Sequence, residues 1–292
     1  MGKLIRCITS DGLVMATALD STDIVAEAER IHKPSAVVTA ALGRLLTAGS
    51  MMGNMLKSEG NSLTLRLSGG GPAGNLIVVS DWQGDVRGYV SNPVVEIPLN
   101  PKGKLDVSGA VGKTGNLYVT KDLGLKEPYN GCIPLVSGEI AEDITAYYAV
   151  SEQIPTVCTL GVLVNPDLTV KVAGGYIIQL LPAAGEDTIE LIEKGMKDIP
   201  SVTAMLRSGE TPLGMIKKAL CEFEVEVLYE QDVYYKCNCS RERIETALIT
   251  LGTEELNKMA DELPEVEVNC HFCDKSYKFS PNEVRFLAKN QD

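Results

Sequence analysis

The chain has 292 residues, of which 45% are hydrophobic and 23% charged, and its formal net charge is −12. This length and composition are typical of a globular protein with one large domain or two to three ordinary ones. The acidic balance argues against a nucleic-acid-binding surface, which needs clustered basic side chains, so we expect no nucleic-acid partner.

The fold class that the sequence predicts is α+β, with residues 1–182 as a mixed core domain. It begins with a strand hairpin over 3–9 and 12–19, followed by a helix that ends near Ile31. The remaining elements expected in this part are strands at 63–67, 75–80, 85–91, 116–120 and 132–137, a helix over 140–151, and a strand hairpin over 156–181.

Residues 36–56 form an almost uncharged run that is long enough to span a membrane. Arg44 stands near its centre, together with several polar residues and three glycines. Because a charge at that depth is costly in a bilayer, we predict a buried core helix and no membrane partner. The first residues also lack the apolar stretch of a secretory signal, so we expect a cytoplasmic protein.

Residues 183–231 are predicted to form a helical linker, because the pattern becomes helical and acidic after Pro182. Helices are expected near 186–198, 201–208 and 212–221, the last with Thr211 as its cap and Pro212 at its first position. Helices this short are marginal alone and need a partner surface.

Residues 232–292 are predicted to form a small C-terminal zinc-binding domain. Ser240 and Thr253 are expected to begin helices that end near Leu251 and Leu263, and Ser280 with Glu283 has the pattern of a capping box before a last helix. The segment contains 12 acidic and 8 basic residues, whereas a zinc finger that grips phosphates should be basic.

Two tight cysteine pairs, Cys237 with Cys239 and Cys270 with Cys273, lie in this segment. In a reducing compartment such pairs indicate a metal or redox site rather than structural disulfides. A tetrahedral zinc with Zn–S bonds of about 2.3 Å needs its sulfurs ~3.8 Å apart, so the first pair must curl to share one ion. We predict one closed four-thiolate zinc site.

We expect no enzymatic activity. The run that ends in Gly112-Lys113-Thr114 resembles a phosphate-binding loop, but the first glycine that this motif requires is replaced by Val107. His32 and His271 are the only histidines, and neither stands in a zinc-hydrolase motif. A closed four-cysteine site has no open position for water, and a flanking role is favoured for His271.

The residues alone leave a static zinc ribbon and a redox switch equally open. Each cysteine pair is close enough to form a disulfide within itself, and a segment with few large apolar side chains depends on its metal to fold. A thiol-disulfide oxidoreductase acting through Cys270 and Cys273 is less favoured, because no thioredoxin-like βαβ unit surrounds them. Cys7, Cys132, Cys158 and Cys221 are expected to be buried and inert.

The cysteine arrangement resembles that of the 33 kDa chaperonin family, the redox-regulated heat-shock chaperones, with all four cysteines matched. The similarity extends over nearly the whole chain. It includes Gly69–Pro72, Tyr89–Pro93, Val136–Glu139, Ser151–Pro155 and Ala173–Gln179.

This resemblance implies an ATP-independent holdase that protects unfolding proteins from aggregation under oxidative stress. The reduced form, with zinc on Cys237, Cys239, Cys270 and Cys273, would be inactive. Oxidation would form Cys237–Cys239 and Cys270–Cys273 disulfides, release zinc, unfold the C-terminal segment and linker, and expose apolar surface to clients. The resemblance also implies client binding and dimerisation through residues 1–182, with a homodimer as the oxidised form.

Overall fold

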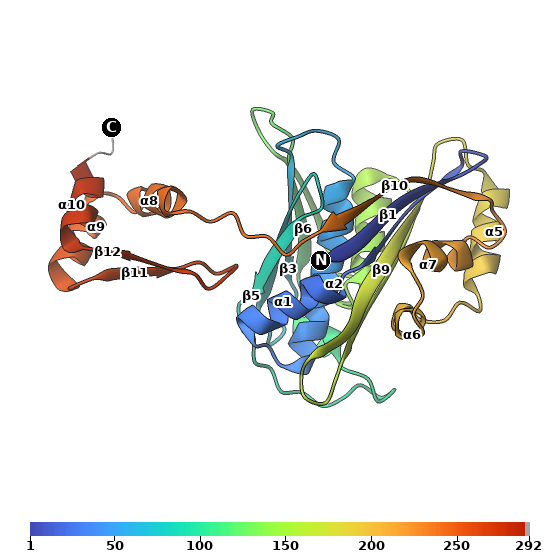
Figure 1. The fold of residues 1–292 in the computed structure, drawn as a ribbon, viewed down its shortest axis with the longest axis horizontal. Helices are drawn as coiled ribbons and strands as arrows, with labels where there is room; N and C mark the ends of the chain where they lie inside the picture. Colours follow the sequence, from blue (N-terminus) through green and yellow to red (C-terminus); the bar gives the residue numbers. More distant parts are fainter. Residues whose placement is uncertain (290–292) are drawn as a thin grey trace. The chain divides into compact units, whose positions relative to one another are not determined.

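The structure is a computed structural model that describes residues 1–289, and contacts divide the chain into two units. We call Met1–Lys236 the core unit and the part that begins at Cys237 the cysteine unit. Each is described by itself (Figure 1).

The core unit contains two antiparallel sheets of five strands each. The strands of the first sheet, in spatial order, are β10 (Val225–Val233), β1 (Gly2–Thr9), β2 (Val14–Asp20), β9 (Val170–Leu180) and β8 (Thr156–Val164). Those of the second are β5 (Val86–Val90), β4 (Asn75–Asp81), β3 (Ser62–Ser68), β6 (Asn116–Asp122) and β7 (Tyr129–Pro134). Buried and partly exposed residues alternate along β3 and β4, so one face of this sheet points into the core.

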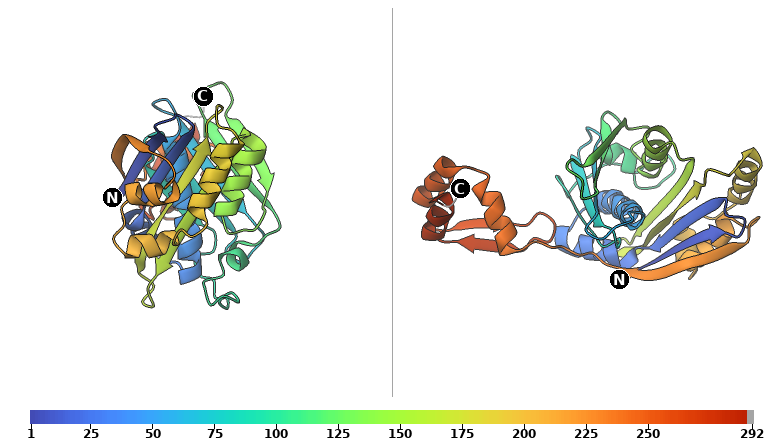
Figure 2. Two further views of the ribbon diagram at one scale, coloured as in Figure 1. Left: turned by 90° about the vertical axis from the view of Figure 1, so that its right-hand side faces the viewer. Right: turned by 90° about the horizontal axis from the view of Figure 1, so that it is seen from above.

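Helix α2 (Ala36–Asn54) lies between the two sheets, as Figure 1 and the right view of Figure 2 show. It is long and apolar enough to cross a membrane, but 89% of the apolar window is buried within the structure. The predicted core helix is therefore confirmed. Arg44 reaches the edge of the core, where its Nη1 forms an ion pair of 2.6 Å with Oε2 of Glu139.

The first 160 residues of the core unit contain four shorter helical segments, namely α1 (Thr22–His32), α3 (Val107–Val111), α4 (Ala141–Tyr147) and the π-helical turn η1 (Tyr148–Glu152). The N-terminal hairpin and the helix after it are confirmed. Strand β7 begins and ends three residues earlier than predicted. The amides of Val136 and Ser137 donate to Oδ1 of Asp143, at 2.7 and 3.1 Å, and so turn the chain away from the sheet.

The three predicted linker helices are present as α5 (Glu186–Met196), α6 (Val202–Arg207) and α7 (Pro212–Ala219). They cover the face of the first sheet opposite α2, as the left view of Figure 2 shows. There Met205, Met215 and Ile216 pack against Ile5 and Tyr176. The sheet thus supplies the partner surface that such short helices need.

The expectation that the chain stays helical up to residue 230 is wrong. Residues 225–233 form β10, an edge strand that pairs antiparallel with β1. Within the described residues only one of its two edges is paired, and most of its residues, apolar and charged alike, are exposed without the strict alternation that would identify a strand. The functional division into residues 1–182, 183–231 and 232–292 stays a prediction.

The cysteine unit contains helices α8 (Arg241–Ile249), α9 (Thr253–Glu262) and α10 (Pro281–Lys289), with a hairpin of β11 (Val266–Asn269) and β12 (Ser276–Phe279). Its small core is built around Phe279, Leu256 and Val284. The predicted capping box is confirmed. The amide and hydroxyl of Ser280 each donate to Oε2 of Glu283 at 2.7 Å, and the Glu283 amide donates back to the hydroxyl.

The close approach of α2 to the second sheet gives a test of the core. A Cβ at Gly53 would clash with the hydroxyl of Ser80 and would lie 2.7 Å from the carbonyl oxygen of Asp81. We expect Gly53→Ala to lower the free energy of unfolding by about 1–3 kcal/mol, because overpacking outweighs the better helix propensity of alanine. Urea unfolding followed by the fluorescence of Trp82, the chain's one tryptophan, measures this.

The matched control is Gly185→Ala, where an added Cβ meets no atom within 4 Å. Its effect should stay below about 1 kcal/mol. Equal stability of the two variants would contradict the packing of α2 described here.

Candidate metal centre

The structure brings together the four cysteines that the sequence singled out. The Sγ atoms of Cys237, Cys239, Cys270 and Cys273 all lie within 4.8 Å of one another. The Sγ atoms of Cys237 and Cys270 are 3.7 Å apart, and those of Cys239 and Cys273 are 3.4 Å apart. These separations are close to the edge of ~3.8 Å expected for a tetrahedron of sulfurs around zinc.

The second cysteine pair is positioned by the turn between β11 and β12. The amides of Cys273 and Asp274 donate to the carbonyl of Cys270 at 3.3 and 2.8 Å, and the Cys270 amide donates to the carbonyl of Lys275 at 3.0 Å. Asp274 adopts a left-handed conformation with φ 59°, which an aspartate tolerates better than most residues. The hairpin thereby points both sulfurs to one side.

The first pair lies in the short stretch before α8. Ser240, which follows Cys239 directly, accepts a hydrogen bond from the Arg243 amide and so fixes the start of the helix. The backbone amide of Cys239 donates to the sulfur of Cys237, which gives the curled shape that two cysteines at this spacing need. Helix cap and amide together position this pair.

The donor set suits a soft divalent cation held in a closed site. Four thiolates in a tetrahedron bind zinc or a similar thiophilic ion, and they leave no coordination position for water. Cys270 is buried, whereas the other three cysteines are partly exposed. His271 lies between two of the ligands in sequence but is not among the clustered metal-binding groups of the described residues.

Burial and hydrogen bonds shift the pKa values of Cys237, Cys239 and Cys273 in different directions. The hydroxyl of Tyr277 donates to Sγ of Cys239 at 3.1 Å. Burial would raise the pKa of Cys239, but this bond and those from the neighbouring thiols outweigh it and lower the pKa to about 7. Burial raises the pKa of Cys237, and likewise that of Cys273. Of these three, Cys239 is the one whose thiolate is favoured.

The four cysteines outside the cluster fall into two groups. Cys7 and Cys158 are buried, and burial raises the pKa of Cys7 to about 11 and that of Cys158 further, so both are inert as predicted. Cys132 and Cys221 are exposed, which corrects the expectation that they are buried. Cys132 lies on the face of β7 opposite to the buried Gly131 and Ile133, and Cys221 follows α7 at the surface, so neither side chain is covered.

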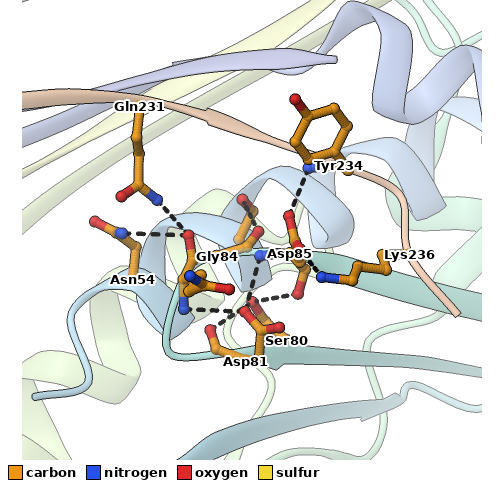
Figure 3. A network of polar contacts seen from close by, with 10 residues as sticks. Asn54, Ser80, Asp81, Gly84, Asp85, Gln231, Tyr234 and Lys236 are labelled. Atoms are coloured by element: carbon orange, nitrogen blue, oxygen red, sulfur yellow. Dashed lines mark hydrogen bonds and ion pairs between the residues drawn. The ribbon is translucent and has the colours of Figure 1, made fainter. Parts of the chain in front are cut away.

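The chain just before Cys237 is fixed to the core unit by a polar network (Figure 3). Oδ1 of Asp85 accepts from the Tyr234 amide at 2.9 Å, and its Oδ2 forms an ion pair of 2.8 Å with Lys236. The Val86 amide donates to the Tyr234 carbonyl and the Lys236 amide to the Val86 carbonyl, each at 2.9 Å. Asp85 itself is buried.

Asp81 lies beside this carboxylate and positions it. Oδ1 of Asp81 accepts from the Asp85 amide at 3.1 Å, and burial together with the charge of Asp85 raises the pKa of Asp81. The hydrogen bond to Asp85 raises the pKa of Lys236. The network therefore fixes residues 234–236, which end where the cysteine unit begins.

Sequence reasoning missed Tyr277 and Asp85. The position of Tyr277 four residues after Cys273, on the strand that leaves the turn, is the one signal that points to it. Asp85 lies in a turn between strands. No pattern in the neighbouring sequence indicates its role, because Tyr234, to which it is bonded, is almost 150 residues away in the sequence.

The chain is similar over nearly its whole length to proteins of known family. Residues 2–280 match the model of the Hsp33 protein family. A 33 kDa chaperonin of Clostridium botulinum is 45% identical over 288 residues, which cover 99% of this chain and 97% of the relative. One of Lachnoclostridium phytofermentans is 49% identical over 282 residues, covering 97% and 96%. The crystal structure of the 33 kDa chaperonin (HSP33) of Thermotoga maritima matches with a TM-score of 0.89 at 39% identity and covers 98% of this chain and 97% of its own.

The network at Asp85 can be tested by local stability. We expect Asp85→Ala to lower the opening free energy of the Tyr234 and Lys236 amides by about 1–3 kcal/mol, because a buried charged acceptor is lost. Native-state hydrogen exchange at these amides measures it. The control is Asp232→Ala, which removes an exposed ion pair with Lys3 and should change little. Equal protection in both variants would show that Asp85 does not fix this segment.

Proposed function

This chain belongs to the Hsp33 family of chaperones, and on that premise we propose that it is a redox-regulated, ATP-independent holdase. It binds unfolding proteins under oxidative stress and keeps them from aggregating. The observation that carries the proposal is the convergence of four thiols in a unit that is separate from the core unit. The reduced, zinc-bound form is inactive, and the disulfide-bonded, zinc-free form is active.

Zinc on Cys237, Cys239, Cys270 and Cys273 holds the cysteine unit folded. The unit has a small core, and the four ligands come from two segments of the chain, residues 237–239 and 270–273. Metal binding contributes ~10–16 kcal/mol in zinc-finger peptides, which is comparable to the whole stability of an ordinary domain. The fold of this unit therefore depends on the four thiolates remaining reduced.

Oxidation removes these ligands in pairs. A thiolate attacks the chlorine of hypochlorous acid, the O–Cl bond breaks and hydroxide leaves. The neighbouring thiolate then attacks that sulfur, the S–S bond forms and chloride leaves, so two electrons pass from two sulfurs to the oxidant. The resemblance to the Hsp33 family implies that the pairs that close are Cys237–Cys239 and Cys270–Cys273, and in each pair the two cysteines are near enough in the sequence to form a disulfide. A site without thiolates no longer holds the ion.

The linker helices supply the surface that clients bind. Helices α5, α6 and α7 cover an apolar face of the first sheet that includes Val14, Ala16 and Ile178. Short helices whose outer faces are exposed belong to the least stable parts of a fold. Their release would uncover this face and their own apolar sides, and unfolding proteins would bind there.

Three further properties complete the proposal. The oxidised protein forms a homodimer through the core domain of residues 1–182, which also contributes to client binding. The protein acts in the cytoplasm, where zinc-bound thiols stay reduced until stress. It needs neither nucleic acid nor a membrane.

Removal of the metal gives a direct test of the fold of the cysteine unit. A strong chelator should unfold α8, α9 and α10, since their small core cannot replace the energy of metal binding. Hydrogen exchange should show loss of protection there, while β3 and β4 of the core unit stay protected. Retention of all three helices in metal-free protein would contradict the dependence on zinc.

The switch itself is tested by oxidation. Hypochlorite should release zinc from the loaded protein, and suppression of citrate synthase aggregation should then rise. We expect Cys273→Ser to lose zinc and to act without hypochlorite. Cys221→Ser, at an exposed cysteine outside the cluster, should behave as the unaltered protein does.

Two results would overturn the proposal. If zinc leaves but aggregation suppression never rises, the switch is excluded, whereas thiols that resist mild peroxide would indicate a static zinc ribbon. If the protein reduces insulin disulfides catalytically, it is a thiol-disulfide oxidoreductase.

A further inference from the structure

Tyr277 stands out in the cysteine unit because its hydroxyl contacts a metal-binding sulfur. The hydroxyl lies 3.1 Å from Sγ of Cys239 and donates to it. Tyr277 lies on β12, where it pairs with Val268 of β11, and its side chain is almost fully buried at 6% exposure. Nζ of Lys275 lies 5.1 Å from the centre of the ring. The ring is therefore held in place by contacts that do not involve the hydroxyl.

The hydrogen bond to Cys239 differs in kind from those to its neighbours. Cys237 accepts from the backbone amide of Cys239, and Cys273 accepts from the backbone amide of Lys275. These amides are present whatever the side chains are. The donor to Cys239 is a side-chain hydroxyl, so a single substitution can remove it without altering the backbone.

Such a donor affects both binding and reactivity of a thiolate. Four thiolates around one divalent cation leave an excess of negative charge on the sulfurs, and a hydrogen bond withdraws part of it. A metal-bound sulfur has already lost its proton, so a donor that shares its lone pair does not change its protonation state and only makes it a weaker nucleophile toward an electrophile. Partners of metal ligands typically change metal affinity by 10–100-fold when they are mutated.

We propose that Tyr277 is a positioning residue that restrains the reactivity of Cys239 and tightens metal binding through its hydroxyl hydrogen bond. The inference rests on the proposed redox switch. In that switch, Cys239 is the sulfur whose reactivity toward electrophiles is set by one side chain. Loss of the hydroxyl makes Cys239 react earlier and weakens the hold on the metal. The hydroxyl thus raises the threshold at which the site is oxidised.

The test compares Tyr277→Phe with the unaltered protein, both loaded with zinc. Chelator competition should show zinc affinity lowered about 10-fold. Limiting N-ethylmaleimide followed by mass mapping should show Cys239 alkylated about 3–10-fold faster, with Cys237, Cys270 and Cys273 changed less. The control is Ser276→Ala, which removes the neighbouring hydroxyl, bonded to Glu267 at 2.6 Å, and should change neither measurement.

A rescue separates the hydrogen bond from packing. Replacement of Tyr277 by 4-aminophenylalanine restores a donor at the same place and should return Cys239 to its original rate. Equal acceleration of all four thiols in Tyr277→Phe, or no change at Cys239, would overturn the inference. So would a 4-aminophenylalanine variant as fast as Tyr277→Phe, and this arm decides the matter even if the phenylalanine variant folds poorly.

These measurements need no client protein. Failure of the inference therefore appears in the alkylation pattern. Failure of the proposed chaperone function appears instead as unchanged aggregation suppression after oxidation.

Discussion

The mutual approach of four sulfurs is the constraint on which the cysteine unit depends. Thiolates at 3.4–3.7 Å repel one another, so the arrangement is stable only with a cation between them or with protons on the sulfurs. Cap, turn and hairpin all serve to bring the sulfurs together. The local chain geometry therefore suits the binding of a cation, whose positive charge offsets the repulsion between the thiolates.

Features that depend on neighbouring residues could be predicted from the sequence. Spacing alone brought out the four cysteines, and turn or cap residues such as Ser280 and Pro212 marked helix starts that the structure confirms. The apolar run of α2 was assigned to the core because of Arg44, and that assignment holds. Each of these features is decided by residues within a few positions of one another.

Long-range pairing is what the sequence could not show. Strand β10 owes its conformation to β1, more than 200 residues earlier, and its own pattern is ambiguous. The bonds of Asp85 to residues 234–236 and of Tyr277 to Cys239 likewise join positions that no periodicity relates. The exposure of Cys132 depends on which face of the second sheet is covered by other elements, and that arrangement emerges only in three dimensions.

The linker helices occupy the chain between β9 and β10, two strands of the same sheet. Helices released from such a position remain a loop that is closed at both ends, and they do not become a free tail. Loop closure limits the entropy that release can gain, and it keeps the helices at a high effective concentration near the face they left. Because both ends of the linker are attached to the sheet, release of the helices is less favourable and their return to the sheet is fast. This suits a surface that must be exposed to clients and then covered again.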